Sequence, residues 1–210
     1  MMESKRLEIT ESALKLFCQY GIKSVSMDDI ARELGMSKKT LYQSINDKNE
    51  LVEEALQLAA NQDCKVMSIF KREDINAIEQ FFEYKKMMEP HIGQYQPTIM
   101  FDLKKYYPGV LQDFQNNQKD VIMDAYSANI QQGKKEGFYH EDVKEDVIAR
   151  LMFAHHVYTF DDSNGLFMAN ELRDMELFNE VFKYHFRGIC NAKGMEEVER
   201  LFCENNEEQK

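Results

Sequence analysis

Apolar residues recur at helical spacing along almost the whole chain, and residues that interrupt helices are scarce. Only 9 Gly and 3 Pro occur among the 210 residues, of which 43% are apolar. Apolar positions three and four residues apart form one face of a helix. A shortage of turn-forming residues also disfavours the many tight turns of a sandwich or barrel. The sequence therefore predicts an all-α fold of about nine helices that is long enough to bury a core.

The charge is distributed unevenly along the chain. The formal net charge is −11, which taken alone disfavours a nucleic-acid partner because phosphate binding usually leaves a basic footprint. Residues 1–50, however, hold eight basic and eight acidic side chains, so the whole acidic excess lies after residue 50. This difference predicts two parts of the chain with different tasks.

Several classes of protein are not indicated. No stretch approaches the roughly 18 uncharged apolar residues of a membrane helix, and the start lacks the apolar segment of a signal peptide. We therefore expect a cytoplasmic protein with no membrane partner. Cys18, Cys64, Cys190 and Cys203 lack the spacing of a metal site, so we expect reduced thiols, no metal and no cofactor. Phosphate loops, nucleophile elbows and metalloprotease motifs are missing, which disfavours an enzyme.

Residues 26–45 have the local signals of a helix-turn-helix. Ser26 and Asp29 are spaced as a capping box for a short helix, which Gly35 ends. Ser37 follows as the cap of the next helix. The brief interval between Gly35 and Ser37 predicts a tight turn between two short helices.

The same segment has the apolar residues that would hold two such helices together. Ile30 and Leu41 can join them, Ala31 is small where they cross, and Gly35 can adopt the positive φ of the turn. The second helix keeps a polar outer face, whose residue types bond phosphates and base edges in a major groove. That face consists of Lys38, Lys39, Thr40, Tyr42 and Gln43.

A set of spaced positions extends this pattern on both sides. The positions are Phe17-Cys18-Gln19-Tyr20-Gly21, Ile30-Ala31, Gly35-Met36-Ser37, Leu41-Tyr42 and Lys48-Asn49-Glu50-Leu51. With them, residues 3–63 resemble the DNA-binding domain of TetR-type transcriptional regulators. The resemblance implies a helical effector-binding and dimerisation domain over residues 64–210. The chain departs from the family at Lys39, where members often have Gly, and at Ser44-Ile45, where they often have an aromatic pair.

The resemblance implies three kinds of DNA contact, namely phosphate ligands, bonds to the DNA backbone, and base readers. The phosphate ligands would be Tyr42 and Lys48, and Ser37 and Thr40 would bond the DNA backbone. The base readers would be Lys38, Lys39 and Gln43. Ser26 and Met27 would present backbone N–H groups to phosphate, since helix N-termini attract anions. Lys5 and Arg6 could reach adjacent phosphates or only solvate the chain end.

The remainder of the chain offers a possible ligand site and a possible dimer interface. Its helices are rich in Phe, Tyr and Met, which can accommodate apolar molecules or simply form core. The residues chosen for a pocket are Phe81, Tyr84, Met88, Phe101, Met123, Tyr126 and His155. A wide apolar stripe predicts dimerisation through the eighth and ninth helices. That stripe consists of Phe178, Val181, Phe182, His185, Phe186 and Ile189. The acidic tail has only a weak stripe at Val198, Leu201 and Phe202, to which we assign no role.

These features together predict a sequence-specific DNA-binding regulator. We expect a homodimer that represses by occupying a palindromic operator and is released by a small, largely apolar ligand, although activation stays open. The alternative is a helical scaffold of similar build that acts through a protein partner without binding an operator.

Overall fold

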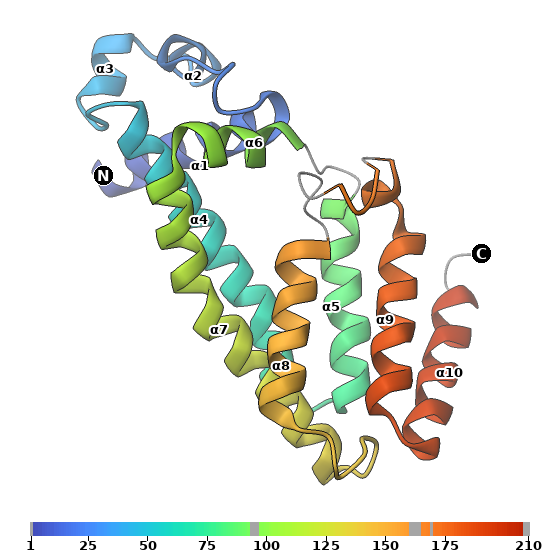
Figure 1. Ribbon diagram of the computed structural model, residues 1–210. Coiled ribbons are helices and arrows are strands. Elements are labelled where there is room, and N and C mark those ends of the chain that lie inside the picture. The colour runs from blue at the N-terminus through green and yellow to red at the C-terminus, as the bar shows by residue number, and fades with distance from the viewer. Residues whose placement is uncertain (1, 93–96, 160–164, 169, 208–210) are drawn as a thin grey trace. The chain divides into compact units, whose positions relative to one another are not determined.

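The computed structural model describes residues 2–92, 97–159, 165–168 and 170–207. These residues form helices joined by turns and loops, with an isolated antiparallel bridge between Tyr139 and Cys190. The predicted all-α fold is confirmed (Figure 1). Within these ranges no helix combines the length and the apolar character needed to cross a membrane.

Ten α-helices lie in the described part of the chain. They are α1 (Met2–Tyr20), α2 (Met27–Glu33), α3 (Lys38–Tyr42), α4 (Lys48–Met67), α5 (Ala77–Ile92), α6 (Pro97–Tyr106), α7 (Pro108–Lys135), α8 (Glu145–Ala154), α9 (Met175–Ile189) and α10 (Ala192–Glu207). Shorter 3-10 helices are η1 (Ser68–Lys71) and η4 (Glu171–Arg173), and α8 continues into a π-helical turn, η2 (His155–Thr159).

The chain divides into two compact units. Met1–Asp63 and Gln94–Gln118 form the first unit, and Cys64–Gly93 and Lys119–Lys210 form the second. Residues 94–118, which the sequence assigns to the larger domain, thus belong with the N-terminal helices. The reason is packing, because Leu103 of α6 and Leu111 of α7 are buried in the apolar core of the first unit.

In the first unit, one face of α1 provides much of the core. Ile9, Ala13 and Phe17 follow the helical spacing and are all buried. Gly21 ends the helix with φ +82°, a left-handed conformation that costs glycine little. The chain then turns into α2, as the sequence predicts.

The core of the second unit is built around aromatic side chains. The ring centroid of Phe70 lies 4.7 Å from that of Phe81 and 5.2 Å from those of Tyr84 and Tyr126. Such separations are favourable for aromatic pairs. α10 also contributes, because the ring of its Phe202 lies 4.9 Å from Phe82 of α5. The tail that the sequence left without a role therefore covers α5, and Figure 1 shows α5, α9 and α10 side by side.

α9 turns the predicted dimer stripe toward its own chain, which corrects that prediction. Four of the six residues chosen for the interface, Phe178, His185, Phe186 and Ile189, are buried. Phe182 packs against the same core, with its ring centroid 5.4 Å from that of Phe81 on α5. Side chains that fill the core of one chain cannot also form its contact with a second copy.

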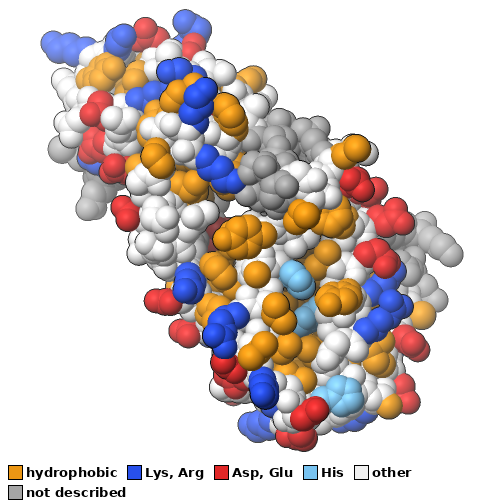
Figure 2. All heavy atoms as spheres, in the orientation of Figure 1, with side chains coloured by type: hydrophobic (Ala, Val, Ile, Leu, Met, Phe, Trp, Pro, Cys, Tyr) orange, Lys and Arg blue, Asp and Glu red, His pale blue; other side chains and the backbone are white. Residues whose placement is uncertain are grey.

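Val181, the remaining residue of the predicted interface, lies on another face of α9 with Leu177 and Tyr184, which follow the same helical spacing. Leu177 and Val181 are partly exposed, and Tyr184 is 72% exposed. α8 and η2 carry exposed apolar residues at similar spacing, namely Val147, Leu151 and Tyr158, and Leu151 is 51% exposed. The centroid of the His155 ring, on η2, lies 6.4 Å from that of Tyr184. We call these residues of α8, η2 and α9 the outer apolar face, and Figure 2 shows apolar side chains gathered there.

The cysteines differ in accessibility, and each unit has one that is exposed. Cys18 of α1 and Cys203 of α10 are exposed, whereas Cys190, which follows α9, is buried. Burial raises the pKa of the Cys190 thiol to about 12. Desolvation of the sulfur also raises the pKa of Cys18.

Candidate nucleic-acid interface

α2 and α3 pack through the apolar residues that the sequence singles out. Ile30, Ala31 and Leu41 are all buried. Gly35 has φ +60° in the turn, and the N–H of Met36 donates to the carbonyl oxygen of Ala31 at 2.9 Å. The apolar contact and the tight turn together fix the direction of α3 relative to α2.

Ser26 begins α2 with the predicted capping box. The Asp29 N–H donates to Ser26 Oγ at 3.2 Å, and the Ser26 N–H donates to Asp29 Oδ2 at 2.9 Å. The Ser26 hydroxyl also donates to Asp29 Oδ2 at 2.6 Å, and this bond, together with the one from the Ser26 N–H, holds the pKa of the Asp29 carboxyl below its usual value. Met27 is buried, so its side chain helps to anchor α2 while its N–H belongs to the first turn.

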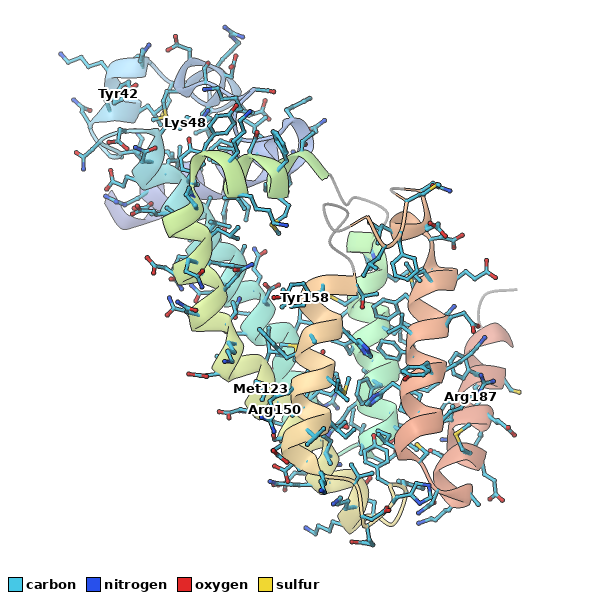
Figure 3. All side chains as sticks on the ribbon, in the orientation of Figure 1. Tyr42, Lys48, Met123, Arg150, Tyr158 and Arg187 are labelled. Carbon is cyan, nitrogen blue, oxygen red and sulfur yellow. The ribbon has the colours of Figure 1, made fainter. Side chains whose placement is uncertain are left out.

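α3 presents the polar face that the sequence predicts. Ser37 caps it, accepting from the Thr40 N–H at 3.1 Å. Lys38, Lys39 and Gln43 are exposed, and Tyr42 is 43% exposed, as Figure 3 illustrates for Tyr42.

One lysine of this face already has a partner. Lys38 Nζ lies 2.9 Å from Asp28 Oδ1 of α2, and the hydrogen bond to Asp28 raises the pKa of Lys38. Both side chains are exposed, so the pair contributes little to stability and can exchange partners.

Lys48, expected as a phosphate ligand, braces a loop within the first unit. Its ammonium donates to the carbonyl oxygens of Ile22 at 2.6 Å and Val25 at 2.5 Å. Burial lowers the pKa of Lys48, and the charge of Lys23 lowers it further. Two of the three ammonium protons are therefore engaged in the loop between α1 and α2.

Arg6 also has a structural role. Its Nε donates to Glu54 Oε1 at 2.6 Å, its Nη2 to Glu50 Oε1 at 2.5 Å, and its Nη1 to the Ser44 carbonyl at 3.1 Å. The two carboxylates raise the pKa of the guanidinium. Of the two alternatives for Arg6, phosphate contact or simple solvation, the structure favours neither, because the side chain ties α1 to α4.

A contact from α6 to the same loop has no local signal in the sequence. Asp102 is only 7% exposed and accepts from the backbone N–H of Lys23 at 2.7 Å. Gly21 lies against it, because a Cβ added there would stand 3.2 Å from Asp102 Oδ2. Lys23 Nζ lies 4.8 Å from the centroid of the Tyr106 ring, also on α6.

The residues chosen for a ligand pocket are only partly brought together. Phe81, Tyr84 and Tyr126 are buried in the second unit, and Met88 and Met123 pack against the same core. Phe101 is separate from them, because it lies on α6 in the first unit and is 57% exposed. A surface groove of about 370 Å³ on the second unit is lined by other residues, including Arg187, Val198 and Phe202 of α9 and α10.

Comparisons with known sequences find similarity in the N-terminal part of the chain. Residues 9–55 match the family model of bacterial regulatory proteins of the tetR family. An HTH-type transcriptional regulator of Staphylococcus aureus (strain USA300) is 43% identical over 49 residues, which are 23% of this chain and 26% of that protein. The match thus spans about a quarter of the relative's length.

Solved structures share the fold over most of the chain. A TetR-family transcriptional regulator from Agrobacterium tumefaciens has a TM-score of 0.70 at 16% identity, with 91% of this chain and all 100% of that chain covered. A transcriptional regulator from Cytophaga hutchinsonii has a TM-score of 0.68 at 20% identity, with 89% and 99% covered. At these identities the likeness concerns the fold.

Proposed function

We propose that the chain is a homodimeric, sequence-specific DNA-binding regulator of the TetR type, whose family model its residues 9–55 match. The observation that carries this proposal is the exposed polar face of α3. Lys39, Tyr42 and Gln43 are exposed there while Leu41 is buried against α2. A short helix held in this way, with donors for phosphates and base edges on its outer side, suits the major groove.

The proposed symmetry comes from the outer apolar face. Contiguous exposed apolar surface usually marks an interaction site, and a two-fold dimer uses the same patch on both copies. A dimer built on this face presents two helix-turn-helix segments, which we call the heads (residues 26–45 of each copy). Such a pair binds the two half-sites of a palindrome. Occupation of a promoter by the dimer would repress it.

The proposed response to a small, largely apolar ligand involves the second unit. His185 Nε2 and Asn179 Oδ1 are buried and have no hydrogen-bond partner among the described residues. Buried polar atoms are normally bonded, so a ligand with one or two polar groups could satisfy them. Such a ligand would release the operator only if it binds better to the conformation with the wrong spacing of the heads.

The direct test of the proposal is selection of bound duplexes from a random DNA pool. If the chain is such a regulator, the selection should recover a palindrome. The chain should bind this duplex with a Kd of about nanomolar size, and the Kd should rise steeply with salt concentration. Recovery of no preferred sequence would contradict the proposal and favour the alternative, a scaffold that acts through a protein partner.

Lys39→Ala and Tyr42→Phe are each expected to weaken binding to the recovered duplex. Loss of a base or phosphate contact at Lys39 costs about tenfold in Kd, and loss of the Tyr42 hydroxyl costs somewhat less. Both side chains are exposed, so thermal unfolding should stay unchanged. Fluorescence anisotropy measures the Kd, and Lys15→Ala, an exposed lysine of α1, is the control. Unchanged binding by both variants would exclude the outer face of α3 as the reading surface.

A further inference from the structure

The loop from Gly21 to Val25, which joins α1 to α2, is held from two sides. Asp102 of α6 accepts from the Lys23 N–H at 2.7 Å. Lys48, at the start of α4, donates to the carbonyls of Ile22 and Val25 at 2.6 Å and 2.5 Å. Charge-assisted bonds of this kind are stronger than neutral ones, so the backbone of this loop is fixed immediately before the Ser26 cap.

The side chain of Lys23 is the available cation of this loop. The residue is exposed, and within the described ranges no carboxylate forms an ion pair with its ammonium. The Tyr106 ring lies 4.8 Å from Lys23 Nζ, which favours one position of the charge through a cation–π contact. Lys48, by contrast, is partly buried and donates to two carbonyls.

We propose that Lys23 binds a phosphate of the DNA backbone, and that Lys48 and Asp102 position it by fixing the loop. This inference rests on the proposed DNA-binding function. Lysine binds phosphate as a point charge, and holding its backbone and its ammonium in place lowers the entropy lost on binding. The loop ends at Val25, directly before the Ser26 cap of α2, so Lys23 is three residues from the start of the helix-turn-helix. Lys23 thereby takes the phosphate-binding role expected of Lys48, whose ammonium donates to two carbonyls of the loop.

The test measures the Kd of the full chain for the selected duplex over a series of salt concentrations. Lys23→Gln is expected to raise the Kd about threefold to tenfold at moderate salt and to reduce the slope of log K against log salt by about one, since one phosphate contact contributes about 0.9. Lys15→Gln removes the same charge from an exposed position of α1 and should leave the slope of log K against log salt unchanged. The melting temperature of Lys23→Gln should equal that of the wild type.

The positioning role of Asp102 is tested with the same measurement. Asp102→Ala removes the acceptor of the Lys23 N–H, so its slope should move toward that of Lys23→Gln. The double variant should lose no more slope than Lys23→Gln alone, because both changes act on one contact. A residue that only stabilises the fold would lower the melting temperature without changing the slope.

The outcomes separate this inference from the proposed function. A wild-type chain that binds the selected palindrome, together with a Lys23→Gln slope equal to that of the wild type or of Lys15→Gln, would overturn the role of Lys23 and leave the regulator intact. If Lys23→Gln changes the slope and Asp102→Ala does not, the positioning role is overturned. If the wild type selects no duplex, the proposed function fails and this inference fails with it.

Discussion

Leu151→Glu is expected to convert the dimer into a monomer and to weaken operator binding at least about a hundredfold. Leu151 is 51% exposed in the single chain, so a glutamate there remains hydrated in the monomer. In a two-fold dimer it would be buried on both copies, where an unpaired charge is costly. A monomer places only one head on the palindrome and loses the benefit of linked binding to the second half-site.

Light scattering with size-exclusion chromatography measures the mass, and anisotropy measures the Kd for the selected duplex. Arg150→Glu is the matched control, because it introduces the same side chain at the neighbouring exposed position, where Arg150 pairs with Asp146. It should stay dimeric and bind the duplex. A Leu151→Glu variant that keeps both the dimer mass and the operator affinity would exclude the outer apolar face as the interface.

Acid is expected to destabilise the second unit through His185. Burial among aromatic rings, with a smaller contribution from the charge of His155, lowers the pKa of His185 from 6.5 to about 3. The unfolded chain therefore binds a proton below pH 6.5 that the folded chain does not bind. The free energy of unfolding should fall as the pH drops from 6.5 toward 3, by about 1.4 kcal/mol per pH unit from this group.

Urea unfolding between pH 7.5 and 4.5 measures this dependence. In His185→Leu the fall in unfolding free energy between pH 6.5 and 4.5 should be smaller than in the wild type by roughly 2–3 kcal/mol. His140→Leu is the control, because His140 is an exposed histidine of the same unit. Equal pH dependence of His185→Leu and the wild type would show that His185 is not held neutral in the fold.

The elements that the sequence predicts well depend on short-range rules. The capping box at Ser26 and the positive φ of Gly35 involve residues within a few positions of each other, and both are present. Such signals do not depend on which other parts of the chain pack against the segment.

The elements that the sequence does not predict depend on which partner covers a surface. α9 has apolar residues on two faces, and helical spacing alone cannot say which face meets the core, so most of the stripe predicted for the dimer interface is core instead. The bond between the Lys23 N–H and Asp102 joins residues 79 positions apart. Neither helical periodicity nor a capping pattern indicates a bond between residues so far apart in the sequence. The bonds from Lys48 to the Ile22 and Val25 carbonyls lack a sequence signal for the same reason.

The accessible thiols give the chain two natural points of chemical attachment, one in each unit. Cys203 and Cys18 are exposed, while the buried Cys190 has its pKa raised to about 12 and stays protonated. Since the thiolate is the reactive form, a maleimide should modify Cys203 first and Cys18 more slowly, because the pKa of Cys18 is also raised. Spin labels or fluorophores placed there would report the separation of the units in solution, with and without DNA.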